Sequence, residues 1–219
     1  MKNAWKYVGL ALVGYSLLAG ILSDVPRLPI VNETIRNLYY HVPMWFTMIA
    51  LMGASFGYSI GALRTQSLER DRRAAHLSEV ALVFAVAGLL TGMLWAKFTW
   101  GAFWTPDPKL NGTAITLLIY LAYFVLRSSV DDPEKRLRLS ATYNIFAFVL
   151  MVVFIGVLPR LTDSLHPGNG GNPAFGSYDL DNRMRTVFYP AVLGWILLGF
   201  WMAQLRTRIE NAANPLNLD

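Results

Sequence analysis

The chain has 219 residues, of which 54% are hydrophobic and only 15% are charged, whereas an average soluble domain carries about 25% charged residues. The hydrophobic residues lie in long blocks, and this pattern excludes an ordinary soluble domain and predicts a single membrane-embedded bundle. The net charge of +5 does not indicate nucleic-acid binding, because the basic residues cluster at the ends of the hydrophobic blocks, where membrane topology explains them.

Six hydrophobic blocks predict an all-α integral membrane protein, a bundle of six transmembrane helices. The blocks cover residues 5–22, 43–63, 78–96, 113–126, 139–158 and 186–205. Five of them approach the roughly 20 residues that cross a hydrocarbon core, and a helix satisfies its own backbone in lipid. The fourth block is shorter, so we expect its helix to begin at the membrane interface. The first block could instead belong to a secretory signal, but it lacks a good cleavage site and we expect a retained helix.

The lysines and arginines predict the orientation of this bundle. Twelve of the nineteen lie in the N-terminal tip, the second and fourth connections and the C-terminal tail, which share one side. The positive-inside rule then places both termini in the cytoplasm and turns the connections 97–113 and 159–185 outward. The second of these is long and rich in glycine at 167–173, so we expect it to move over a ligand.

The connection 97–113 differs from an ordinary polar loop. It carries aromatic rings at Phe98, Trp100, Phe103 and Trp104, and the sequence Pro106-Asp107-Pro108 restricts the backbone around an acid. Tryptophan at a membrane interface is often only an anchor, and Asp107 could simply cap the next helix or pair with Lys109. The combination nevertheless predicts a flat hydrophobic surface with one oriented carboxylate.

Two histidines, His41 and His166, lie on the same predicted side as this surface, whereas His76 lies on the other side and is expected to be a solvated interfacial residue. Imidazole is a common ligand of iron. An iron macrocycle needs axial donors, a planar hydrophobic surface and cations for its carboxylates. Haem is therefore a candidate ligand, held without thioether bonds because the chain has no cysteine. The candidate cations are Arg36, Lys109, Arg160, Arg183 and Arg185.

The pattern in this loop resembles a known signature. It reads Trp100-Gly101-x-x-Trp104-x-x-Asp107-x-Lys109-Leu110 and is similar to the tryptophan-rich motif of the haem-handling protein family. Over nearly its whole length the chain resembles the C component of the system I cytochrome c maturation machinery, also called haem exporter protein C. The first histidine of the family corresponds to His41 in the segment His41-Val42-Pro43, and the second corresponds to His166 in the segment Thr162-Asp163-Ser164-Leu165-His166. The arginine of the family corresponds to Arg36. Three positions depart from the pattern: Phe103 and Pro106 stand where an aromatic residue or tryptophan is frequent, and Lys109 replaces an arginine.

The resemblance implies a function and a set of partners. Haem b would be held non-covalently and transiently at the periplasmic face of the bacterial inner membrane. His41 and His166 would be its axial ligands, and its other contacts would be Trp100, Gly101, Phe103, Trp104, Asp107, Lys109 and Arg36. The haem would pass to a membrane-anchored haem chaperone (the E component). The further partners would be the A and B components of an ATP-binding cassette (ABC) complex, the small membrane D component and membrane lipid, with no nucleic acid. This chain would hydrolyse nothing and would not be an enzyme.

Two other classes of function stay open at this stage. One is the haem synthase of the second maturation system, which shares the tryptophan-rich loop, although such proteins are typically longer. The other is a haem- or quinone-binding anchor subunit of a respiratory complex. Such subunits usually place their histidine ligands inside the helices, where the predicted helices of this chain have none. A permease is less favoured, because charge is nearly absent from the predicted spans.

Overall fold

The structure, a computed structural model, describes residues 3–166 and 180–213. These residues form helices without any β-strand. In chain order the elements are α1 (Ala4–Leu22), the 3₁₀ helix η1 (Asn32–Asn37), α2 (Leu38–Thr65), α3 (Leu68–Trp100), α4 (Pro108–Ser128), α5 (Pro133–Met151), the π-helix η2 (Val152–Val157), α6 (Leu158–Leu161) and α7 (Asn182–Ala213). Six helices, one of them continuing through η2 and α6, are long and hydrophobic enough to cross a membrane. The predicted all-α bundle of six transmembrane helices is confirmed.

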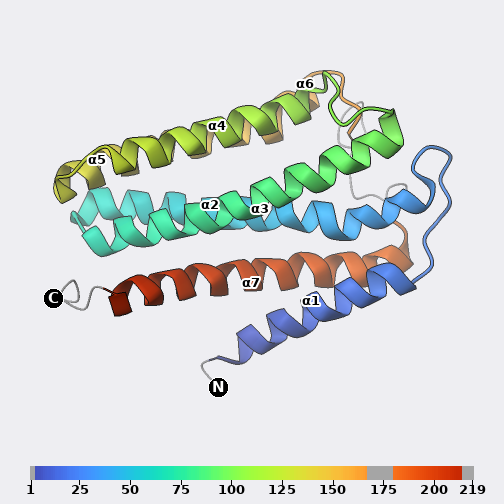
Figure 1. The fold of residues 1–219 in the computed structure, drawn as a ribbon, viewed down its shortest axis with the longest axis horizontal. Helices are drawn as coiled ribbons and strands as arrows, with labels where there is room; N and C mark the ends of the chain where they lie inside the picture. Colours follow the sequence, from blue (N-terminus) through green and yellow to red (C-terminus); the bar gives the residue numbers. More distant parts are fainter. Residues whose placement is uncertain (1–2, 167–179, 214–219) are drawn as a thin grey trace.

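The bundle has α2 and α3 at its centre, with α4 and α5 on one side and α7 and α1 on the other (Figure 1). We call the end where α1 begins and α7 finishes the termini end. The opposite end, the loop end, carries η1, the connection between α3 and α4, and the stretch after α6 (Figure 1). The two predicted outward histidines and the tryptophan-rich segment therefore belong to one end of the molecule.

Several helices extend beyond the hydrophobic blocks. The third helix begins at Leu68 rather than at residue 78 and continues to Trp100, and its first turn is charged, with Ser67 accepting a hydrogen bond from the Arg70 amide. A helix needs backbone hydrogen bonds and a cap rather than hydrophobic side chains, so it continues where it leaves the lipid. The fourth helix likewise begins at Pro108. The expected loop 97–113 is consequently much shorter, and Trp100 is the last residue of a helix.

Polar side chains inside the termini end join the helices. Asp71 on α3 is 3% exposed and accepts two hydrogen bonds from Arg127 on α4, at 2.8 and 2.7 Å. Nearby, the Asn144 amide of α5 donates to Ser55 and Ser59 of α2, both at 2.8 Å. Such pairs in a membrane bundle fix the rotation of one helix against another, because an unpaired polar group there is costly.

The π-helix η2 brings the second outward segment back to the start of α4. A Cβ atom on Gly112 would lie 2.4 Å from the carbonyl oxygen of Phe154, so only glycine allows this approach of the two backbones. The close contact directs the residues after α6 towards Asp107 at the N-terminus of α4. It thereby joins the two connections that the sequence predicts to share one side.

Candidate functional site

The carboxylate of Asp107 is the centre of the polar contacts at the loop end. It is 3% exposed and caps α4, with its Oδ1 accepting hydrogen bonds from the Lys109 and Leu110 amides at 2.9 and 3.3 Å. Its Oδ2 accepts bonds from the Ser164 hydroxyl at 2.8 Å and from the Leu165 amide at 2.7 Å. Asp107 therefore fastens the segment after α6 to the beginning of α4.

The same carboxylate orients His166. The imidazole Nδ1 lies 2.9 Å from Asp107 Oδ1. Burial alone would raise the pKa of Asp107, but the hydrogen bond and charge of His166, with the bonds from Leu165 and Ser164, outweigh it and hold that pKa below its ordinary value. An ionised carboxylate can only accept, so Nδ1 carries a proton, and in the neutral form of this imidazole the lone pair is on Nε2. Among the described residues no hydrogen bond reaches this Nε2, and the side chain is 20% exposed.

His166 also contacts the tryptophan-rich segment. Its ring stands edge-on to Trp100, with 5.0 Å between the ring centroids and 75° between the planes. The next residue, Gly101, ends α3 in the left-handed conformation with φ of 82°, where glycine avoids the strain that a Cβ atom would bring. The chain then turns away sharply from Trp100 and leaves the indole beside the imidazole.

His41 occupies the first turn of α2 and packs against α3. Its Nδ1 lies 3.0 Å from the Gly88 carbonyl oxygen and 3.2 Å from the Thr91 hydroxyl. Its Nε2 accepts a hydrogen bond from the indole N–H of Trp45 at 3.2 Å, and the Trp95 ring stands edge-on to it with centroids 5.8 Å apart. Contacts from α2 and α3 therefore fix the position of the ring, which stays partly exposed.

The two histidines share one region. Trp95, beside His41, and Trp100, beside His166, are five residues apart on α3, which corresponds to about 7.5 Å along a helix axis. Asp107, bonded to His166, also accepts a hydrogen bond from the Lys109 amide. The structure thus brings together His41, His166, Trp100, Asp107 and Lys109 from four separate parts of the chain.

Hydrophobic rings beyond α3 provide an open surface next to this region. Phe103 is 51% exposed and Trp104 is 40% exposed. The Trp104 indole donates to the Asn111 side chain at 3.2 Å, and the ammonium of Lys97 lies 5.8 Å from the centre of the Phe103 ring. Both rings have contacts that position them and remain partly exposed, as a surface for a flat hydrophobic ligand requires.

Arg36, expected beside the ligand, has other contacts. Its guanidinium donates to the carbonyl oxygens of Gly20 and Ile21, both at 3.2 Å, and to that of Ser23. It also forms an ion pair with Glu33 at 2.9 Å. These bonds satisfy carbonyl groups left open at the C-terminal end of α1. Arg36 therefore ties α1 to η1, and its charge is directed towards backbone oxygens.

His76 lies at the termini end. It is buried, at 3% exposure, rather than solvated as the sequence indicates. Its Nδ1 lies 2.9 Å from the Thr207 hydroxyl, and its Nε2 pairs with Glu210. Because both ring nitrogens are occupied by α7, His76 has no lone pair to offer a ligand.

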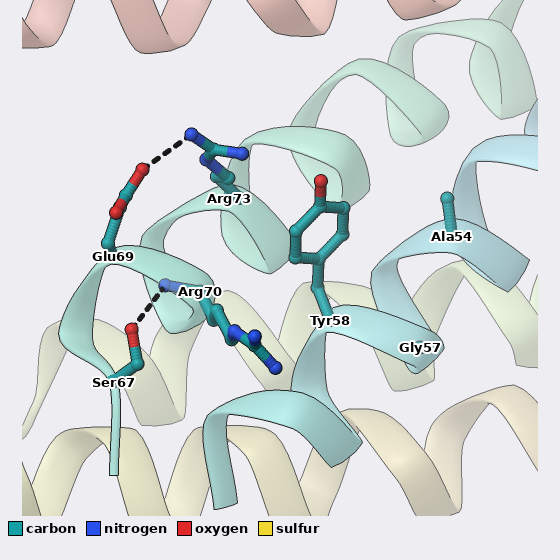
Figure 2. A pocket seen from close by; sticks show the side chains of 7 residues that line it. All are labelled: Ala54, Gly57, Tyr58, Ser67, Glu69, Arg70 and Arg73. Carbon is teal, nitrogen blue, oxygen red and sulfur yellow. Dashed lines mark hydrogen bonds and ion pairs between the residues drawn. The ribbon is translucent and has the colours of Figure 1, made fainter. Parts of the chain in front are cut away.

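Two cavities differ in their distance from the histidine region. One, of about 590 Å³, is at the termini end between α2 and the start of α3, where Tyr58 stands between Ala54 and the Glu69–Arg73 ion pair (Figure 2). The other, of about 340 Å³, lies at the loop end between residues 105–108 and 163–165. Neither contains a histidine. The glycine-rich residues 167–173, predicted to move over a ligand, lie outside the described residues.

Sequence reasoning alone misses Trp45, Gly88 and Gly92. By sequence, Trp45 resembles an interfacial anchor and the glycines resemble a helix-packing repeat. A Cβ on Gly88 would lie 2.8 Å from the Trp45 ring, and one on Gly92 would lie 2.6 Å from the His41 ring. These glycines therefore make room for two rings of the site. The sequence does contain one signal for Trp45: it follows His41 by four residues, a spacing that places both side chains on one face of a helix.

Comparison with known proteins gives a consistent result. A family model described as "Heme exporter protein C" matches residues 3–216. Among curated relatives, "Heme exporter protein C" of Bradyrhizobium diazoefficiens is 30% identical over 114 residues, covering 52% of this chain and 43% of that protein. The protein of the same name from Rhodobacter capsulatus is 26% identical over 215 residues, 92% of this chain and 84% of the relative. "Cytochrome c biogenesis protein CcsA" of Cuscuta reflexa is 26% identical over 165 residues, 72% of this chain and 52% of the relative.

Proposed function

Because the chain belongs to the heme exporter protein C family, we propose that its loop end binds haem b without covalent attachment, with His41 and His166 as the axial ligands. The pair of Asp107 and His166 is the observation that carries this proposal. A carboxylate bonded to one imidazole nitrogen, at 2.9 Å here, fixes the tautomer and makes the other nitrogen a better metal ligand. The macrocycle brings the remaining four donors itself.

The surroundings suit the rest of the haem. Trp100, Phe103 and Trp104 offer ring surface for its hydrophobic face. Lys109 and Arg160 lie close enough for their charges to interact, and together they supply positive charge for propionate groups. Gly101 has no side chain to contact the haem, and its role is to allow the turn that ends α3 after Trp100. We leave Arg36 out of the proposed haem contacts, because backbone carbonyls and Glu33 occupy its guanidinium.

We further propose that the loop end faces the periplasm and that both termini are cytoplasmic. The support is the distribution of charge: of the twelve lysines and arginines on the predicted cytoplasmic side, the eleven within the described residues belong to segments at the termini end. Haem would then be held at the outer surface of the inner membrane, where cytochrome c maturation uses it.

A carrier must also release its cargo. Phe103 and Trp104 are exposed at the loop end, so haem lying on them would be at the surface of the protein, where a membrane-anchored haem chaperone, the E component, could take it up. The A and B components of the ATP-binding cassette complex and the small membrane D component are the partners proposed for this step. The free energy of ATP hydrolysis would come from that complex, and this chain itself would catalyse no reaction.

Haem titration of the purified protein in detergent tests the ligand assignment. We expect a six-coordinate low-spin absorption spectrum for the wild type and its loss in His41→Ala and in His166→Ala. His76→Ala is the matched control and should keep the spectrum, because α7 occupies both of its nitrogens. If both His41→Ala and His166→Ala keep the native spectrum, the proposed ligands are wrong.

The similarity to CcsA over 72% of this chain favours one second candidate, an enzyme that attaches haem covalently to apocytochrome c. Incubation of the haem-loaded protein with apocytochrome c distinguishes the two. A carrier leaves no covalent haem on the apocytochrome without its partners, whereas a synthase produces a haem-staining band under denaturing conditions.

A further inference from the structure

The hydrogen bonds around His41 determine which of its nitrogens could bind iron. The Gly88 carbonyl, 3.0 Å from Nδ1, can only accept a hydrogen bond, so Nδ1 carries the proton. The Thr91 hydroxyl donates to the carbonyl oxygens of Ala87 and Gly88, which leaves its oxygen as a second acceptor for the same proton. The lone pair of His41 is therefore on Nε2.

That lone pair is already in use. The indole Nε1–H of Trp45 donates to His41 Nε2 at 3.2 Å, and an indole nitrogen is a donor only. His166 differs, because its Nδ1 is bonded to Asp107 and no described residue bonds its Nε2. Within residues 3–166 and 180–213, one proposed ligand atom accepts a hydrogen bond and the other accepts none.

The position of Trp45 is built into the fold. His41 and Trp45 are four residues apart on α2, so they lie on one face of the helix. Their rings meet edge to face, with centroids 6.0 Å apart and 78° between the planes. Gly88 leaves the space for the indole, since a Cβ atom there would be 2.8 Å from the Trp45 ring.

We propose that Trp45 competes with the haem iron for Nε2 of His41. This inference rests on the proposed function, because it takes His41 as an axial ligand. Haem binding must break the indole–imidazole hydrogen bond, and haem release restores it. The restored bond offsets part of the free energy lost when iron leaves, so the protein binds haem less tightly and transfers it more readily.

The test removes the indole N–H and keeps an aromatic ring. Trp45→Phe should bind haem more tightly by roughly three- to tenfold, the range expected for one competing hydrogen bond. Its haem should move correspondingly more slowly to excess apomyoglobin, with the low-spin spectrum unchanged. Affinity and transfer rate are measured on the full chain in detergent.

Trp95→Phe is the matched control. The Trp95 ring also stands edge-on to His41, with centroids 5.8 Å apart, but its N–H donates to the Thr34 hydroxyl at 3.1 Å. Its removal should leave haem affinity and transfer within twofold of the wild type. A gain of equal size in both variants would overturn the proposal, because the effect would then come from loosened packing.

Two further outcomes separate this inference from the proposed function. If His41→Ala abolishes the low-spin spectrum while Trp45→Phe binds haem as the wild type does, or more weakly, only the role of Trp45 is refuted. If His41→Ala keeps the spectrum, His41 is no ligand and both proposals fall. Ultraviolet resonance Raman spectra give a readout independent of affinity. The indoles of Trp95 and Trp104 also donate hydrogen bonds, so the readout is the part of the hydrogen-bonded indole signal that Trp45→Phe removes, and this part should be lost from the wild type on haem loading.

Discussion

The two ends of the bundle use the same residue type in opposite ways. At the termini end, His76 is buried and both of its nitrogens are occupied, by Thr207 and Glu210. At the loop end, the Nδ1 atom of His166 is fixed by the carboxylate of Asp107, and no described residue forms a hydrogen bond with its Nε2 atom. A fully bonded imidazole stabilises the fold, whereas an imidazole with one oriented lone pair can bind a ligand. His41 lies between these two cases, because its Nε2 lone pair accepts a hydrogen bond from the Trp45 indole and becomes available to a ligand when that bond breaks.

The largest effect is expected from breaking the buried ion pair of the termini end. Arg127→Met leaves the carboxylate of Asp71 without its two hydrogen bonds and should lower the free energy of unfolding by about 3–5 kcal/mol. Combining it with Asp71→Asn should recover part of the loss, since no buried charge then remains unpaired. Denaturation in detergent measures both. A change below about 1 kcal/mol would mean that water reaches this pair.

A pair of glycines on neighbouring helices tests the packing of the loop end. Gly92→Ala would place a Cβ atom 2.6 Å from the His41 ring, so we expect a cost of about 1–3 kcal/mol together with weaker haem binding. Gly57→Ala on α2 is the control, because nothing lies within 4 Å of the added atom. It should be neutral or slightly stabilising. Equal effects of the two substitutions on haem affinity would contradict the proposed packing of His41.

Two capping aspartates give the finest comparison between the ends. Asp107 and Asp132 both precede a proline and cap a helix, α4 and α5 respectively, but of the two only Asp107 bonds a histidine. Asparagine is also a good cap, so Asp132→Asn should cost little stability. Asp107→Asn keeps a cap but loses one of two accepting oxygens, so it should also weaken the hold on Ser164 and Leu165. Haem affinity should fall roughly 10–100-fold in Asp107→Asn alone, as for other carboxylates behind a metal-binding histidine. An unchanged affinity in the haem titration would reduce Asp107 to a cap.

The fold is predictable from the sequence because a membrane span requires only a high average hydrophobicity over about 20 residues. Long hydrophobic blocks determine where helices cross, whatever their individual residues are. The helix ends are less predictable. The charged first turn of α3, including Glu69 and Asp71, is helical because of its cap and the dipole, and a hydrophobicity pattern does not report either property.

The site is predictable in its residue types but not in its connections. The predicted side of the membrane and the family motif together select His41 and His166. The hydrogen bond between Asp107 and His166, however, joins positions that are 59 residues apart. Nothing local encodes such a contact. Trp45 resembles an anchor because tryptophan is common at membrane interfaces, and its bond to Nε2 of His41 depends on the rotamers of both rings. Arg36 shows the converse, since a position matched by a family motif has its charge directed elsewhere.

The π-helix η2 has a consequence for the length of the chain. Each residue advances an α-helix by about 100°, and a π turn holds one residue more than an α turn. Removing one residue from Val152–Val157 would restore a regular helix and swing the stretch that ends at His166 to another side of the bundle. Hydrophobicity would be untouched and the imidazole would no longer meet its carboxylate. The spacing between α5 and His166 is thus as much a part of the site as the residues themselves.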